Sequence, residues 1–418
     1  MAGENTPSTL AAWFKVQYAE KVLEMVPSWA ILQNLIDFSN KVKLGKYYSQ
    51  PVTLSHEAGF TYNGTAGAIA TLNGPANAAV EDAQVYGSEL ILQTRASYKV
   101  LSQAASAGER AFKQASAALI KGMNDSTRKR LEIAMLYGQS GLGVVSTVTD
   151  LGSNSGEIVL TEASWASGIW SGAEGTYIDA FTSTTKNNSG TLLITKVNTD
   201  ARKLTVTYSG TLASDVAAAD TLWFKGSNAG SSVFNEMAGL HKQLTNSGTL
   251  FNISAATYSL WAGNSVTVSG PLDFGVLQDA TSKAVGKGLM SKVLCLVSPK
   301  AFARLATDQA AMRTFDGSYS SDKAKNGSKG ITFFGANGEM EVKVHPMVKD
   351  GDAFVIPVSD IIRIGSVDLT FEVPSVEGEK FFTLVPNTNA VEFQCMADQA
   401  IFLEKPAHGV FLTGITYA

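Results

Sequence analysis

The spacing of apolar residues changes several times along this sequence, and each change predicts a different kind of element. From Leu10 to Phe38 the apolar positions suit two short helical pieces that Pro27 separates, because a proline ring disfavours helical backbone in the residue before it. Trp13 lies on the first piece and Trp29 on the second. Neither piece has a partner element beside it in sequence, so we expect these tryptophans to dock on the body of the chain or on a neighbouring copy.

Residues 46–100 predict one long β-hairpin. The descending side, at 89–98, alternates apolar and polar residues, which is typical of a strand with one exposed face. The ascending side is expected at 51–62. The tip between them is made mostly of small residues that cannot build a core, and its vicinity carries Tyr62, Ile69 and Leu72. A thin hairpin is marginal alone, so we expect these three side chains to contact another subunit. An ordinary mobile loop is the other interpretation.

Helical spacing follows from residue 103 to residue 137, where Phe112, Leu119 and Met123 lie on one apolar stripe. A helix of some 30 residues would be about 45 Å long, which suits a structural spine better than a compact enzyme domain. The segment 122–126 is expected to interrupt it. The glycines after residue 137 are expected to end it.

From about residue 150 to residue 232 the composition shifts to Gly, Ser, Thr, Asn and Ala. Short alternating strands are predicted at 156–160, 191–195 and 204–208, with turn-forming clusters between them. This pattern indicates an inserted all-β domain, either a barrel or a sandwich.

The remainder of the chain predicts mixed α/β structure. Pro271 is expected to start a helix over 272–285, and a continuously apolar strand follows at 292–297. Ser298 and Pro299 supply the N-cap and first residue of a second helix. An apolar strand beside helices favours a sheet that is covered on both faces. Beyond residue 340 the pattern is rich in strands, which include 391–396 and 400–404.

Composition and charge narrow the possible functions. Hydrophobic residues make up 45% of the 418 residues and charged residues 17%, against roughly 25% charged in an average globular chain. Such a chain must cover uncharged surface, either through contacts between subunits or through extended β-structure. The net charge of −4 argues against a broad nucleic-acid-binding face, which needs clustered Lys and Arg. Cys295 and Cys395 stand among apolar residues and are expected to be buried thiols. We expect no signal peptide and no membrane span.

Residues that could carry chemistry are sparse. The phosphate-loop motif is absent, and Gly138–Gly141 does not complete a nucleophile elbow. The four histidines, His56, His241, His345 and His408, have no partner at a metal-ligand spacing. We therefore predict no catalytic, cofactor-binding or metal-binding residue, and no cofactor.

The order of these parts resembles the major capsid proteins of tailed bacteriophages. Those subunits have an N-terminal arm, an extended loop, a peripheral domain with a spine helix, and an axial domain. The likeness covers most of the chain except the β-insert. The local sequences that carry it are 130–138 at the end of the long helix, 298–300 between strand and helix, 342–346 and 361–365 as axial strands, and 393–402 as a returning strand.

The resemblance implies an α+β phage major-capsid fold and a set of domains. These are an N-terminal arm (1–45), an extended β-hairpin loop (46–100), a spine helix (101–149), an inserted β-domain (150–232), an axial α/β domain with peripheral strands (233–390) and a C-terminal β-return (391–418). Trp13, Trp29, Tyr62, Ile69 and Leu72 are the candidate intersubunit contacts.

The resemblance also implies a non-enzymatic function and a set of partners. The protein is expected to form pentameric and hexameric capsomers of an icosahedral shell around double-stranded DNA, without sequence-specific DNA binding. A separate scaffolding protein and a portal are expected partners, with assembly in the host cytoplasm and a final location in the virion. Two alternatives stay open: a phage decoration or tail protein, and a hydrolase with a β-domain.

Overall fold

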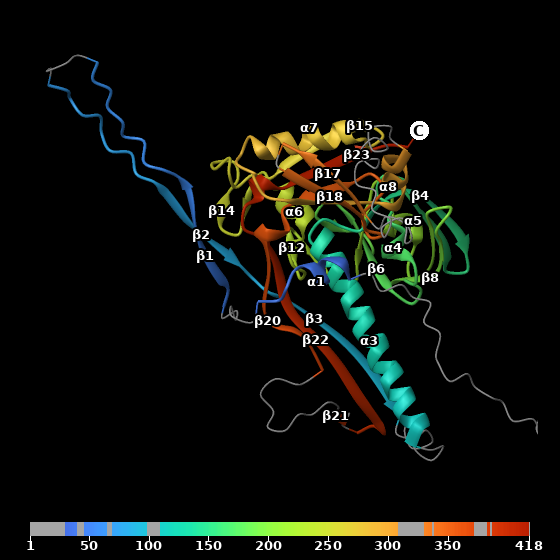
Figure 1. Cartoon of the computed structure of the whole chain (residues 1–418). Coiled ribbons are helices and arrows are strands. Elements are labelled where there is room, and N and C mark those ends of the chain that lie inside the picture. The colour runs from blue at the N-terminus through green and yellow to red at the C-terminus, as the bar shows by residue number, and fades with distance from the viewer. Residues whose placement is uncertain are drawn as a thin grey trace, which may run out of the picture.

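The computed structural model describes residues 30–39, 46–64, 69–97, 109–307, 330–336, 338–371, 383–384 and 387–417. Figure 1 shows a central body of strands and helices, a hairpin that projects from one side of it, and a long helix that leaves the other side together with long strands. Trp13 and Trp29 lie outside the described residues.

The projecting hairpin consists of β1 (Tyr48–Ser55) and β2 (Ala79–Val85), which pair antiparallel. The predicted descending strand does not return along it. That segment is β3 (Ser88–Ser97), and it pairs antiparallel with β22 (Ala390–Leu403). The prediction of one hairpin over 46–100 was therefore wrong in its pairing. Alternation shows that a segment is a strand, but it does not show which strand lies beside it.

The long helix is α3 (Glu109–Tyr137), and it is continuous. The expected interruption at 122–126 was wrong. Met123 and Leu131 are buried, and α3 packs against β3 and β22. This tertiary packing outweighs the low helix propensity of Gly122. Besides β3 and β22, the sheet beneath α3 contains β20 (Ile361–Thr370) and β21 (Thr383–Leu384).

A closed antiparallel barrel follows α3. Its strand order is β10-β4-β5-β9-β8-β6-β7, and an additional pairing of β10 with β6 closes the ring. Alternate residues fill the interior, such as Ile158 and Leu160 of β5 and Leu204 and Val206 of β9. The strands are β4 (Gly143–Gly152), β5 (Ser155–Leu160), β6 (Tyr177–Thr182), β7 (Thr185–Lys186), β8 (Leu192–Asn198), β9 (Lys203–Tyr208) and β10 (Thr221–Phe224).

The three strands predicted for this region are confirmed. The barrel also recruits β4, which begins at Gly143, within the range 101–149 that we had expected to contain the helix. Short elements complete this part of the chain: α4 (Ser167–Trp170), α5 (Leu212–Asp215), β11 (Asn228–Gly230) and β12 (Val233–Phe234).

The body contains a six-stranded mixed sheet in the order β15-β23-β19-β16-β18-β17. Its central strand, β16, is buried along its whole length, so the predicted coverage of both faces is confirmed. The strands are β15 (Asn264–Gly270), β16 (Val293–Val297), β17 (Gly330–Gly335), β18 (Gly338–Val344), β19 (Ala353–Ile356) and β23 (Val410–Ile415).

Helices α7 (Phe274–Val285) and α8 (Pro299–Thr307) share one apolar cluster with one face of this sheet. The predicted cap of α8 is confirmed, because the Ser298 hydroxyl accepts from the Ala301 amide at 3.2 Å. Helix α7 begins after Pro271, where the Asp273 carboxylate accepts from the Val276 amide at 2.8 Å. An aspartate side chain satisfies an end amide of a helix, which proline cannot do.

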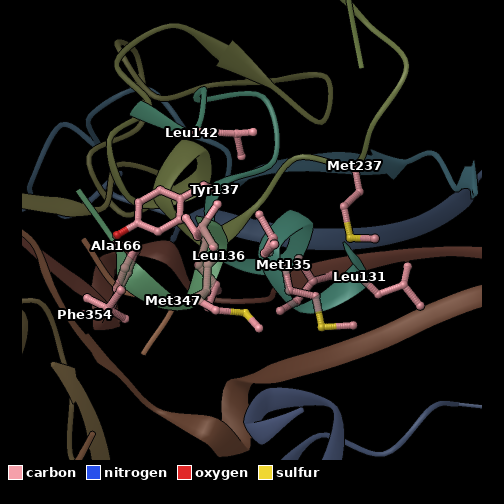
Figure 2. Packing of buried hydrophobic residues seen from close by; sticks show 14 of the residues in the cluster. Leu131, Met135, Leu136, Tyr137, Leu142, Ala166, Met237, Met347 and Phe354 are labelled. Atoms are coloured by element: carbon pink, nitrogen blue, oxygen red, sulfur yellow. The ribbon is translucent and has the colours of Figure 1, made fainter. Parts of the chain in front are cut away.

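The opposite face of the sheet packs on the end of α3 and on α6 (Leu240–Leu244). Figure 2 shows Leu136 and Tyr137 of α3 beside Met347 and Phe354, and the rings of Tyr137 and Phe354 are 5.6 Å apart. The remaining elements are α1 (Ile31–Leu35), β13 (Thr249–Leu250), β14 (Ile253–Ser254) and the 3₁₀ turns η1 (Val358–Asp360) and η2 (Pro406–His408).

Alanine substitutions at two glycines, one within α3 and one just after its end, are expected to change the free energy of unfolding in opposite directions. A Cβ at Gly138 would lie 2.2 Å from the Met237 carbonyl oxygen, whereas a Cβ at Gly122 would meet nothing within 4 Å. Gly138→Ala is expected to lower the free energy of unfolding by about 1–3 kcal/mol, and Gly122→Ala to raise it by about 0.5–1 kcal/mol. Urea unfolding measures both. Equal effects of the two substitutions would contradict this packing.

Candidate interaction surfaces

The end of the hairpin exposes large apolar side chains. Tyr62 is 94% exposed, Ile69 101% and Leu72 79%, and Phe60 beside them is 69% exposed. The structure thus brings three of the five sequence candidates to one tip that projects from the body (Figure 1). Their role as intersubunit contacts stays a prediction, and Phe60 joins them as a residue that the sequence reasoning missed.

The two sides of the tip are held together by a few polar contacts. The Ala58 amide donates to the Ala76 carbonyl at 3.3 Å. Asn73 donates from its side chain to the Phe60 carbonyl at 2.7 Å and from its backbone to the Thr61 hydroxyl at 2.8 Å. Neither side is assigned to a strand beyond Ser55 and before Ala79. The described residues of the tip, 56–64 and 69–78, therefore form no regular ladder.

The root of the hairpin, in contrast, is fixed to the body. Ala83 and Val85 are buried, and the Gln84 amide donates to the Phe251 carbonyl at 2.9 Å. The Phe402 ring lies 6.3 Å from Tyr48 of β1 and 5.5 Å from Phe251. Because its root is fixed and its tip is exposed, the hairpin projects from the body as an arm.

Helix α1 is held at its N-terminus by a carboxylate from α3. Glu132, wholly buried, accepts from the amides of Leu32 at 2.6 Å and Gln33 at 3.2 Å. These are end amides that no residue of the helix itself can satisfy, and Ala30 at the N-cap has no side-chain acceptor. A negative charge also suits the positive end of the helix dipole.

The third donor to Glu132 is His345, whose Nε2 lies 2.9 Å from the carboxylate. The Met347 amide donates to Nδ1 of the same ring at 3.2 Å. Since Nδ1 accepts, the proton of a neutral ring must be on Nε2. His345 therefore donates from Nε2 and orients the Glu132 carboxylate.

Arg363 holds the other end of α1. Its Nη1 donates to the carbonyls of Gln33 at 3.3 Å and Ile36 at 3.2 Å, which are groups that the helix leaves unsatisfied. The guanidinium also bonds to Gln399 at 2.8 Å and to Asp368. Opposite charges therefore clamp the two ends of a five-residue helix.

A second buried polar cluster lies between the barrel, α3 and the six-stranded sheet. Lys349 donates to the Gly141 carbonyl at 3.0 Å and stands 4.1 Å from the centre of the Tyr137 ring. Burial lowers the pKa of Lys349 to about 8 and raises that of Asp352 to about 6. Tyr137 links them, because its hydroxyl donates to Asp352 at 3.1 Å and accepts from the Lys349 amide at 2.9 Å.

His241 of α6 lies beside this cluster. Its ring is 4.5 Å from Phe411 and 5.8 Å from Tyr137. Burial, and after it the positive charges of Lys349 and Lys242, together lower its pKa to about 3. His241 is therefore neutral in the folded protein over the physiological pH range.

A groove of about 550 Å³ runs between β3, α3 and the barrel. Five consecutive residues of β3, Ser88–Leu92, line one side, and α3 lines another. Arg130 of α3 lies in it with its guanidinium carbon 3.2 Å from the centre of the Phe224 ring, and its Nη1 is buried without a hydrogen-bond partner in the described chain. Burial raises the pKa of the neighbouring Glu236 to about 7.

The sequence analysis missed two contacts between a histidine and a carboxylate. These are His345 with Glu132 and His408 with Asp360, the latter at 2.8 Å. Both pairs join residues far apart in sequence, so no spacing could have revealed them. Among the described residues, no group of three or more His, Cys, Asp or Glu could hold a metal ion, and no helix is long and apolar enough to cross a membrane. Cys295 and Cys395 are buried free thiols, as predicted.

Replacing Glu132 with alanine is expected to release α1. The amides of Leu32 and Gln33 and the His345 ring would lose their acceptor, which predicts a loss of about 2–4 kcal/mol in the free energy of unfolding. Urea unfolding measures the loss, and hydrogen exchange at both amides is expected to accelerate. Glu162→Ala is the control, because its exposed ion pair with Lys300 contributes less than about 1 kcal/mol. Similar losses in both variants would contradict the clamp.

Acid is expected to destabilise the fold through His241. Its pKa is about 3 in the folded protein against 6.5 ordinarily, so the unfolded chain binds the extra proton and stability falls as pH drops from 6.5 towards 3. Between pH 7 and pH 4 the wild type is expected to lose about 3 kcal/mol more than His241→Phe. Urea unfolding at the two pH values checks this, and equal losses would refute it.

Comparison with known proteins rests on structure alone. No family profile and no curated protein sequence matches this chain. The chain is similar in structure to the capsid asymmetric unit of cyanophage A-1(L), with a TM-score of 0.58, 8% identity, and coverage of 99% of this chain and 100% of that one. It is also similar to the capsid of a native GTA particle, with a TM-score of 0.51, 9% identity, and coverage of 99% and 100%. This chain therefore has the fold of phage and GTA capsid subunits along nearly its whole length.

Proposed function

We propose that this chain is the major capsid protein of a tailed bacteriophage, a non-enzymatic subunit that self-assembles into an icosahedral head. The observation that carries the proposal is the projecting hairpin, whose apolar tip is exposed on its own subunit (Figure 1). Exposed apolar side chains gathered at one site mark a surface for contact with another molecule. The fold shared with capsid subunits along 99% of the chain supports a second copy as that molecule.

The parts of the fold take roles in this proposal. Helix α3 serves as the spine of a peripheral domain, and the barrel serves as the inserted domain at 150–232. The six-stranded sheet forms the axial domain; five of its strands lie within 233–390, and β23 comes from the C-terminal segment 391–418. Residues 1–45 act as an N-terminal arm, and 391–418 act as the β-return. The extended loop is the hairpin of β1 and β2, because β3 belongs to the sheet with β22.

The physical mechanism is multivalent. Burying one large apolar side chain yields about 1.5–3 kcal/mol, which is too little to hold two subunits together in solution. In a closed shell each copy makes several such contacts at once, and the later ones are effectively intramolecular. Reuse of the same surfaces by symmetry gives pentameric and hexameric capsomers.

The proposed partners follow from the same role. The shell encloses double-stranded DNA without reading its sequence, in keeping with a net charge of −4. A separate scaffolding protein and a portal complete the assembly. Assembly takes place in the host cytoplasm, and the mature protein is located in the virion.

Assembly is expected to depend on the hairpin tip. Purified wild-type protein should form capsomers or large uniform particles in light scattering and negative-stain images. Deleting Gly64 to Ala79 should abolish shells and leave a folded subunit, because the buried root residues Ala83 and Val85 remain. Wild-type protein that stays monomeric at high concentration would refute the proposed function.

A milder variant tests the apolar contact itself. Tyr62→Ser is expected to raise the threshold concentration for assembly at least about tenfold, since about 1.4 kcal/mol per contact corresponds to a factor of ten. Leu151→Ser is the matched control, because Leu151 is an exposed apolar residue of the barrel. An equal rise in both variants would show that general surface hydrophobicity, not the tip, drives assembly.

A further inference from the structure

The hairpin tip, residues 56–64 and 69–78, contains two asparagine–glycine pairs. Asn63–Gly64 lies on its ascending side and Asn73–Gly74 on its descending side, and all of these residues are exposed. The side-chain amide of an asparagine is an electrophile, and the backbone nitrogen of the next residue can attack it and close a succinimide ring. Glycine permits this closure best, because it has no Cβ that restricts the backbone or hinders the approach.

The backbone around both pairs is open to the rotation that ring closure requires. Neither side of the tip is assigned to a strand, so no regular ladder of hydrogen bonds fixes it. A Cβ added at Gly64 or at Gly74 would meet nothing within 4 Å. No packed neighbour therefore holds either glycine in place.

Two buried asparagines of the body show the contrast. The Asn188 side chain accepts from the Ala180 amide at 2.8 Å and donates to the Gly190 carbonyl at 2.9 Å. The Asn264 side chain donates to the Ala407 carbonyl at 2.7 Å. Each of these asparagines is followed by a serine, whereas the tip asparagines are exposed and precede glycine.

Asn73 gives the reaction a structural consequence. Its side-chain nitrogen donates to the Phe60 carbonyl at 2.7 Å, and its backbone amide donates to the Thr61 hydroxyl at 2.8 Å. The first of these bonds joins the two sides of the tip, and it uses the nitrogen that deamidation removes. A carboxylate in the same place has no hydrogen to donate and repels the carbonyl oxygen.

We propose that Asn63 and Asn73 deamidate spontaneously in the free subunit, and that loss of the Asn73 amide separates the two sides of the tip. The backbone nitrogen of the following glycine gives up its proton and bonds to Cγ. The bond from Cγ to Nδ2 breaks, and Nδ2 leaves with that proton as ammonia. Water then opens the succinimide at either carbonyl and yields aspartate or isoaspartate, so the subunit gains one negative charge at each site.

This chemistry limits the time during which a free subunit can assemble, a consequence that rests on the proposed shell function. Each new carboxylate lies next to an exposed apolar side chain, Tyr62 beside Asn63 and Leu72 beside Asn73. An ionised carboxylate is costly to remove from water. It therefore opposes burial of the tip against another copy, and aged subunits are expected to be left out of particles.

Peptide mapping by mass spectrometry tests the modification itself. The full-length protein is incubated as free subunit, and conversion is followed at each asparagine. Asn63 and Asn73 are expected to become aspartate and isoaspartate, faster at mildly alkaline than at mildly acidic pH, while Asn264 stays intact. A synthetic peptide of residues 56–78 gives the rate without the fold. Intact Asn63 and Asn73 under conditions that convert the peptide would overturn the proposal.

The matched variant carries Gly64→Ala and Gly74→Ala and keeps both asparagines. Neither added Cβ meets a neighbour, so the fold is expected to persist. Conversion is expected to slow at least about fivefold, because alanine restricts the backbone rotation that ring closure needs. An unchanged rate would overturn attack by the glycine nitrogen. Asn326 and Asn337 also precede glycine but lie outside the described residues, and the map reports their conversion separately.

Two aspartate variants test the structural consequence. Asn73→Asp removes the bond to the Phe60 carbonyl, whereas Thr71→Asp adds the same charge at an exposed position nearby. Chymotrypsin is expected to cut after Phe60 and Tyr62 about two- to tenfold faster in Asn73→Asp than in Thr71→Asp, the factor that corresponds to a lost hydrogen bond. Equal cleavage of the two variants would overturn the role of the Asn73 amide.

Assembly from partly converted wild-type protein separates this inference from the proposed function. Particles are expected to contain converted chains at a fraction at least about threefold lower than the remaining free subunits, because a tip carboxylate is costly to bury. Equal fractions would overturn the time limit on assembly. If fresh wild-type protein forms no particles, the shell function fails, and peptide mapping of the free subunit still decides whether the tip deamidates.

Discussion

The hydrophobic effect favours the burial of apolar side chains, and this chain leaves a group of them exposed to water. Four large apolar side chains, Phe60, Tyr62, Ile69 and Leu72, lie at the end of a thin hairpin where no second layer covers them. Two strands alone cannot enclose a core. The rest of the hairpin is arranged to keep this tip in place, since its root packs on Phe402 and bonds to Phe251. A fixed root and an exposed apolar tip are the properties of an element that docks on another molecule.

The charged side chains buried inside the body hold secondary-structure elements in fixed positions. Glu132 and Arg363 bind opposite ends of α1, and each also bonds to other elements: Glu132 to His345 and Arg363 to Gln399. Breaking one member of such a network leaves its partners unsatisfied in a low-dielectric interior. These networks therefore fix α1 against α3 and the long strands.

Local patterns predicted the elements well and their partners poorly. The apolar run at Val293–Val297 and the Ser298 cap were readable because their signals lie within a few residues. The pairing of β3 with β22 was not readable, since alternation is the same whichever strand lies beside it. The same limit hid the candidate site. Glu132 is 100 residues from Leu32 and 213 from His345, and the groove takes its walls from α3, β3 and the barrel.

The closure of the barrel affects how freely the sequences of its turns can change in evolution. Because β10 pairs with both β4 and β6, the ring is closed, and among its described strands only the two-residue β7 at the end of the strand order keeps an unpaired edge. An unpaired edge is where a strand of another molecule could add. The sequences of the barrel turns can then change without exposing an unpaired strand edge. The tight turn at Ser153 and Asn154, where both residues have positive φ, is such a place: a foreign peptide inserted there would leave the closed ring of the barrel intact.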